Sequence, residues 1–102
     1  MKAYEVVIMK FKAEATEKAI RQALESTTRF LQTCPGFISR QVLHSSTDGV
    51  WIDQVVWEDM SMALDAAAKF GNAPEVGEFV SLLDTSDMRM LHLTSFYQST
   101  ES

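Results

Sequence analysis

Polar side chains that could do acid–base chemistry interrupt two segments otherwise suited to buried strands. The first segment is Trp51-Ile52-Asp53-Gln54-Val55-Val56-Trp57, which holds a carboxyl, an amide and two indoles. The second segment, residues 88–98, carries His92 in the same way. A buried carboxyl near an imidazole suits proton transfer, because desolvation raises the pKa of the acid while the pair favours the charged imidazole. Asp53 and His92 are therefore the predicted catalytic residues.

The strand period places Asp53 on the same face as the two indoles. Side chains two or four residues apart in a strand point the same way, so Trp51, Asp53 and Trp57 share one face. If the strand of His92 lies two strands from that of Asp53, about 10 Å across the sheet, a ligand or a water could bridge them. Such a pocket could deprotonate a phenol or an enolisable carbonyl compound. The resulting electron-rich anion can react with oxygen without a metal or a flavin.

Each of these assignments has a structural alternative. Asp53 and His92 could be satisfied polar groups that tie strand to helix. Arg40 could bind an anionic substrate or an oxyanion, or it could pair with an acid on an edge strand. Tyr4 could donate a hydrogen bond to a substrate, or its hydroxyl could lie in water at a strand end. Arg40, Tyr4, Trp51 and Trp57 are the predicted substrate-binding residues.

Composition narrows the class of protein. The chain has 102 residues and a net charge of −5, with its lysines and arginines scattered singly. Without a basic stripe, neither nucleic acid nor a membrane surface is an expected partner. No segment is apolar enough to span a membrane, and the single cysteine, Cys34, suits a reducing compartment, so we expect a cytoplasmic protein. His44 and His92 are too far apart to suggest a metal site, and no metal or cofactor is expected.

The hydrophobic pattern predicts six main elements and one short helix. Residues 4–11, 37–45 and 50–58 read as strands, with a turn at Thr47-Asp48-Gly49 between the last two. A helix capped by Thr16 runs to Cys34, where Pro35-Gly36 ends it. A second helix, capped by Asp59 or Ser61, ends at Gly71, and a short helix begins at Pro74 with Val76, Phe79, Val80 and Leu83 inward. Residues 88–98 form the last strand.

This order predicts an α+β fold, the ferredoxin-like βαββαβ plait, with one antiparallel sheet and its helices on one face. Residues 1–98 would form a single domain, followed by a flexible tail at 99–102. In both Tyr4–Phe11 and Val50–Glu58 apolar residues point to either face, although one face of such a sheet should meet water. A second copy packed sheet against sheet would cover the uncovered face, so a homodimer is expected.

Three short motifs resemble a known family. They are Cys34-Pro35-Gly36-Phe37-Ile38-Ser39-Arg40, then Gly49-Val50-Trp51-Ile52-Asp53 with Trp57-Glu58-Asp59-Met60, and Met88-Arg89-Met90-Leu91-His92. Together they resemble the antibiotic-biosynthesis-monooxygenase-like (ABM) superfamily of dimeric α/β-barrel proteins, and in particular an uncharacterised bacterial subgroup. The likeness spans nearly the whole chain.

The resemblance implies a homodimer whose two sheets form a barrel, with a pocket for a small, mostly apolar molecule between sheet and helices. Relatives include cofactor-independent monooxygenases and haem-degrading enzymes. The haem branch uses a histidine on the second helix, which this chain lacks between Ala63 and Phe70. Two hypotheses follow. One is a cofactor-independent monooxygenase-like enzyme that abstracts a proton from a small aromatic or enolisable substrate. The alternative is a non-catalytic dimeric binding or structural module.

Overall fold

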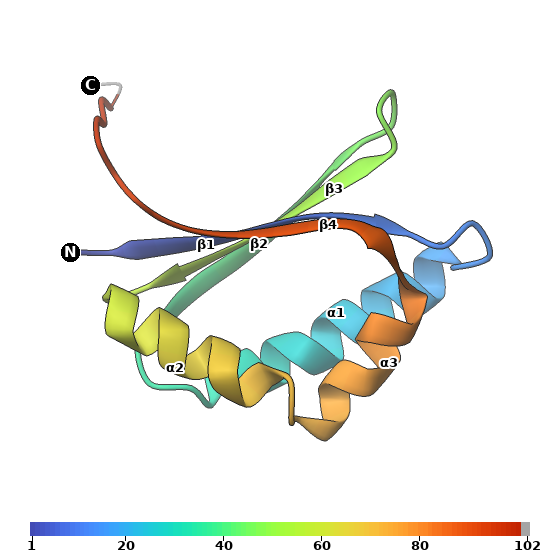
Figure 1. Cartoon of the computed structure of the whole chain (residues 1–102), viewed down its shortest axis with the longest axis horizontal. Coiled ribbons are helices and arrows are strands. Elements are labelled where there is room, and N and C mark those ends of the chain that lie inside the picture. The colour runs from blue at the N-terminus through green and yellow to red at the C-terminus, as the bar shows by residue number, and fades with distance from the viewer. Residues whose placement is uncertain (101–102) are drawn as a thin grey trace.

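Four antiparallel strands form one sheet, and three helices cover one of its faces (Figure 1). The computed structural model describes residues 1–100. In chain order the elements are β1 (Ala3–Phe11), α1 (Glu17–Gln32), β2 (Phe37–Ser45), β3 (Val50–Trp57), α2 (Met60–Phe70), α3 (Pro74–Leu82) and β4 (Leu83–Thr94). The strand order across the sheet is β2-β3-β1-β4. The predicted ferredoxin-like βαββαβ plait is confirmed.

Local signals in the sequence set the ends of most elements. Thr16 caps α1, where its Oγ1 accepts a hydrogen bond from the Ala19 amide at 3.1 Å. Asp59 caps α2 in the same way through the Met62 amide at 2.9 Å. Gly36 turns the chain from α1 into β2 with a φ of 87°, a left-handed conformation that favours glycine. These signals set where α1 and α2 begin and where the chain turns into β2.

The last strand differs from its prediction. It was expected at residues 88–98, but β4 begins at Leu83, directly after α3, and ends at Thr94. Leu83 pairs with Phe11, and the ladder with β1 shifts register between Ile8 and Lys10. Of the polar run at 84–87, which reads as a loop, Asp84 pairs with Lys10, and the register shift takes up the residues between Asp84 and Arg89. The strand ends at Thr94, which pairs with Ala3, the first residue of β1.

The core lies between the sheet and the helices. One cluster joins Trp57 and Val55 of β3 to Leu31 of α1 and to Ala63 and Ala66 of α2. A second cluster contains Met9, Ala23, Phe79 and Leu83. Val76 and Phe79 of α3 point inward as predicted, but Val80 is 43% exposed, so its expected inward position is wrong.

The opposite face of the sheet carries no helix (Figure 1). The pairing registers place these apolar side chains on it: Val6, Ile8, Leu43, Ile52, Val56, Leu91 and Leu93. Within residues 1–100, no helix combines the length and the apolar character needed to cross a membrane. The predicted boundary at residue 98 stays a prediction, and residues 101–102 of the expected tail lie outside the described residues.

Candidate functional site

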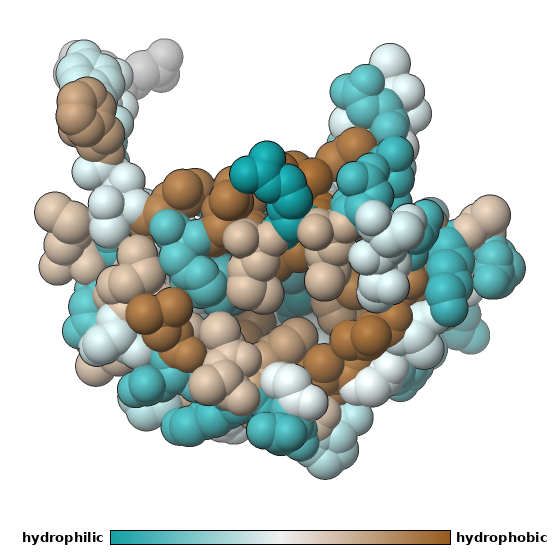
Figure 2. Space-filling view, viewed as in Figure 1, coloured by the Kyte–Doolittle hydropathy of each residue, from teal (hydrophilic) through white to brown (hydrophobic). Residues whose placement is uncertain are grey.

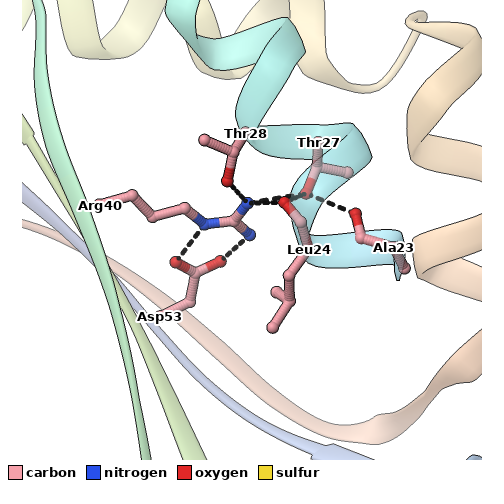
Figure 3. Close-up of polar contacts among 6 residues, drawn as sticks. All are labelled: Ala23, Leu24, Thr27, Thr28, Arg40 and Asp53. Atoms are coloured by element: carbon pink, nitrogen blue, oxygen red, sulfur yellow. Dashed lines mark hydrogen bonds and ion pairs between the residues drawn. The ribbon is translucent and has the colours of Figure 1, made fainter. Parts of the chain in front are cut away.

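A buried ion pair joins β2 to β3 on the helix-covered face (Figure 3). Arg40 Nε donates to Asp53 Oδ1 at 3.0 Å, and Nη2 donates to Oδ2 at 2.6 Å. The two side chains are 5% and 9% exposed. This forked geometry matches the guanidinium edge to the carboxylate edge, which makes the pair strong and directional. Both carboxylate oxygens of Asp53 are therefore occupied by one arginine.

The same arginine also ties the sheet to α1. Its Nη1 donates to Thr27 Oγ1 at 2.7 Å, Thr28 Oγ1 at 2.8 Å and the Leu24 carbonyl at 3.0 Å (Figure 3). Its guanidinium carbon lies 5.9 Å from the centre of the Phe79 ring. Arg40 is thus the hub of a network that reaches two strands and a helix, and Asp53 is its counter-ion.

A second polar pair joins β1 to β4. Glu5 and His92 are paired residues of the ladder, and Glu5 Oε2 lies 2.8 Å from His92 Nε2. Burial is the largest effect on Glu5 and raises its pKa. The hydrogen bond from His92 and the charge of His92 lower that pKa. The nearby charge of Asp53 also raises the pKa of Glu5, and the charge of Arg40 lowers it. One proton can lie on either partner, since the carboxyl and the imidazole can each donate to the other. The pair can therefore take up or release a proton.

A small cavity adjoins both pairs. Its volume is about 40 Å³, and its walls include Glu5, Arg40, Asp53, Phe70 and Met90. Ala66 and Ala67 of α2 close it from below, and their small side chains leave room there. Figure 2 shows the molecule hollowed between β4 above and the helices below. The space suits a single functional group or a water molecule rather than a ring.

The remaining predicted residues are spread over the fold. Trp57 is fully buried in the core, packed edge-on against Phe37, and its Nε1 has no hydrogen-bond partner in the described chain. Trp51 shares its face but lies toward the β2–β3 hairpin, stacked on His44. Tyr4 pairs with Val56 and Leu93 on the opposite face of the sheet. The structure thus brings Asp53, Arg40 and His92 together around Glu5, and the other three lie apart.

Sequence reasoning missed Glu5 and Thr27. Glu5 lies in the first strand, where every neighbour from Val6 to Met9 is apolar, so an acid there was as informative as Asp53. Thr27 recurs at the inward spacing of α1 and is fully buried, with its hydroxyl donating to the Ala23 carbonyl at 2.9 Å. In both cases a polar residue at a core position was the available signal.

Comparison with known proteins agrees with this architecture. No protein-family model and no curated protein matches the sequence. Among solved structures, the chain is similar to the cofactor-independent oxygenase SnoaB of Streptomyces nogalater, with a TM-score of 0.80, 18% identity and 98% of each chain covered. The fold is that of the ABM-like proteins. The resemblance predicted from the three motifs is confirmed at this level.

Two further structures support the same fold. The monooxygenase ActVA-Orf6 of Streptomyces coelicolor, solved with the ligand nanaomycin D, matches with a TM-score of 0.70, 23% identity and coverage of 98% of this chain and 92% of that one. A dimeric ferredoxin-like protein of unknown function from Jannaschia matches with a TM-score of 0.68, 12% identity and coverage of 93% and 100%. At these sequence identities the likeness establishes the fold alone. The activity has to be inferred from the residues of the site.

Proposed function

We propose that this ABM-like chain binds a small, mostly apolar molecule at the cleft between β4 and α2, with the reacting group of that molecule in the small cavity and its rings outside the cavity. The Glu5–His92 pair then removes a proton from the reacting group. The 2.8 Å contact between a carboxyl of raised pKa and an imidazole, beside a cavity, is the observation that supports the proposal. A general base works best when its pKa lies near the operating pH, and burial moves Glu5 in that direction. The substrate class is a phenol or an enolisable ketone.

The other polar residues then have positioning roles. Asp53 holds Arg40 with both of its oxygens, so in this proposal it fixes the guanidinium beside the cavity and does not itself accept the proton. The fixed positive charge of Arg40 would favour a developing phenolate or enolate. His92 shares its proton with Glu5 and returns it to the product or to water.

The proposed reaction needs no cofactor beyond dioxygen. Loss of the proton gives a carbanion-like enolate, which transfers electrons to dioxygen and forms a carbon–oxygen bond. Loss of water from the resulting hydroperoxide gives a quinone. For a phenol the balance is one phenol and one dioxygen in, one quinone and one water out. SnoaB, as a cofactor-independent oxygenase, belongs to the same class of chemistry.

The assembly proposed for this chain is a homodimer. The uncovered sheet face carries a continuous set of half-exposed apolar side chains, seen as brown atoms along the upper side of the molecule in Figure 2. The β2–β3 hairpin and the C-terminal segment both project on that side (Figure 1), and Phe96 and Tyr97 are 104% and 82% exposed. A second copy would cover this surface. Native mass spectrometry should show a species of twice the 11.5 kDa protomer mass, and a monomer would refute the assembly.

The test of the activity uses anthrone, an enolisable polycyclic ketone. Oxygen uptake and quinone absorbance are followed for the parent chain and for Glu5→Gln and His92→Gln. General-base catalysis contributes typically 10²- to 10⁴-fold, so each variant should lose about 10²-fold or more in rate while keeping the circular dichroism spectrum of the folded parent. Glu25→Gln, an exposed glutamate on α1, is the matched control.

An anaerobic measurement separates proton removal from the oxygen step. Enolate formation from anthrone is read by its absorbance in the absence of oxygen, and it should depend on Glu5 as the aerobic rate does. If neither enolate nor quinone forms above the rate in buffer, or if Glu5→Gln keeps full activity, the catalytic proposal fails. The non-catalytic binding module is then the better account of the fold.

A further inference from the structure

A second and larger cavity lies at the other end of the helix-covered face. Its volume is about 570 Å³, and it lies between the first half of α1 and the β2–β3 hairpin. Pockets for small ligands usually have 300–1,000 Å³, so this one can hold a molecule of one to three rings. The residues that matter here are Ile20, Arg21, Leu24, Val42, His44 and Trp51.

Two stacked rings form one wall of this cavity. The imidazole of His44 lies parallel to the indole of Trp51, with centroids 3.9 Å apart and planes at 15°. The Phe11 ring lies at right angles to the indole, with centroids 5.1 Å apart and planes at 89°. These contacts fix the plane of Trp51. A fixed aromatic wall in a cavity also lined by Leu24 and Val42 suits a flat aromatic ligand, because packing against it costs little when the protein ring is already held.

The mouth of the cavity carries a cation. Arg21 lies in the first turns of α1, and its Nε and Nη2 both donate to the same oxygen of Glu17, at 3.3 and 3.2 Å. The two side chains are 72% and 78% exposed, so this ion pair contributes little and exchanges readily. Much of the guanidinium remains for another acceptor, and the nearby amino-terminal end of α1 also favours an anion. The carboxylate of Glu17 repels an incoming anion, and that anion must displace Glu17 from Arg21.

This cavity is separated from the first site by the Arg40 network. The Leu24 side chain lines the large cavity, while its carbonyl accepts a hydrogen bond from Arg40, which lines the small one. Glu5 and His92 lie on the far side of the Arg40 network. We propose that the large cavity is a second ligand site, which takes a planar aromatic carboxylate packed against the wall formed by His44 and Trp51, with its carboxylate on Arg21.

The test follows Trp51 fluorescence during titration with 2-naphthoate, a flat carboxylate without an acidic hydroxyl or an enolisable carbonyl. Trp57→Phe removes the other tryptophan, so the remaining signal comes from Trp51. Saturable quenching is expected. The neutral amide 2-naphthamide has the same ring and should bind about fivefold to twentyfold more weakly, because it lacks the charge that pairs with Arg21. Calorimetry on the parent chain gives the same comparison without any substitution.

Variants assign the binding to particular side chains. Arg21→Gln should weaken naphthoate by about fivefold to twentyfold and leave naphthamide nearly unchanged. His44→Ala should weaken both ligands, because it removes the ring that holds the indole plane. Arg29→Gln, an exposed arginine on the same helix outside the cavity, is the matched control and should bind as the parent does.

Several results would overturn the inference. They are the absence of saturable binding by calorimetry, equal effects of Arg21→Gln and Arg29→Gln, and equal affinity for acid and amide. Loss of naphthoate binding in Glu5→Gln with retention in Arg21→Gln would place the ligand in the cleft below β4 instead. Failure of the anthrone assay has no bearing on these outcomes, since naphthoate cannot report proton abstraction.

Discussion

Removing Arg40 should destabilise the fold far more than its position on an edge strand suggests. The substitution Arg40→Met keeps much of the side-chain volume but removes every donor. It leaves the Asp53 carboxylate buried without a counter-ion, and it leaves Thr28 and the Leu24 carbonyl each without the bond from Nη1. Breaking a buried ion pair by removing one partner costs about 3–5 kcal/mol in general. With both side chains under a tenth exposed, we expect the loss to fall in that range.

The partner substitution should cost less. In Asp53→Asn the amide oxygen can still accept one hydrogen bond, and Arg40 keeps its three contacts with α1. A loss of about 2–3 kcal/mol is expected, close to that of a hydrogen bond to a charged group. The double variant Arg40→Met with Asp53→Leu replaces the pair by apolar side chains. It should be more stable than Arg40→Met alone, because no charge is then left unpaired.

Urea unfolding at one fixed protein concentration measures these differences, since a dimer's stability depends on concentration. Circular dichroism follows the transition. The coupling between the two positions comes from four free energies, those of the parent, Arg40→Met, Asp53→Leu and the double variant. If Arg40→Met costs less than about 1 kcal/mol, the ion pair is solvated in solution and the buried network is not what holds α1 to the sheet. If the two single losses simply add, Arg40 and Asp53 do not act as a pair.

Two more changes test other parts of the structure. Because burial raises the pKa of Glu5 above 4.5, the stability that protonated Glu5 contributes is complete below pH 4.5 and is lost as the pH rises through the raised value. The melting temperature of Glu5→Gln relative to the parent should therefore increase as the pH rises from 4.5 through the raised pKa of Glu5, and a constant difference would contradict the raised pKa. Gly36→Ala and Gly49→Ala both place a side chain at positive φ, but the new Cβ at Gly36 collides with Met62 while Gly49 has open space around it. Gly36→Ala should therefore lose about 1–3 kcal/mol more than Gly49→Ala in the same unfolding assay, and equal losses would show that Met62 moves aside freely.

Most of the fold could be predicted because its signals are local. The caps at Thr16 and Asp59 and the end of α2 before Gly71 each depend on residues within one helical turn. The β2–β3 hairpin follows from its turn residues and from strands of similar length. The start of β4 is different, because a polar run follows Leu83 directly, and only the pairing of Leu83 and Asp84 with β1 places the start of the strand there. That information is not present in residues 83–87 themselves.

The polar contacts of the site could be predicted only in part, for the same reason. Period two places Asp53 on the helix-covered face, but its partner Arg40 is chosen by the register of β2 on β3. The reach of Arg40 to Thr27 depends on how α1 crosses the sheet, which no spacing in the sequence reports. Likewise, His92 meets Glu5 because β1 lies between β3 and β4. Strand order therefore determined the pairing, and period determined only the face.

The two buried carboxyls, Glu5 and Asp53, differ in the partners that they bind. Both oxygens of Asp53 accept hydrogen bonds from one guanidinium in fork geometry. Glu5 has a single imidazole as its partner, and the negative charge of Asp53 adds to the desolvation that raises the pKa of Glu5. The ion pair thus does more than join strands, because it places a fixed anion near Glu5. Replacing Asp53 by a neutral residue should therefore lower the pKa of Glu5, and the carboxyl signals in NMR titration would show that shift directly.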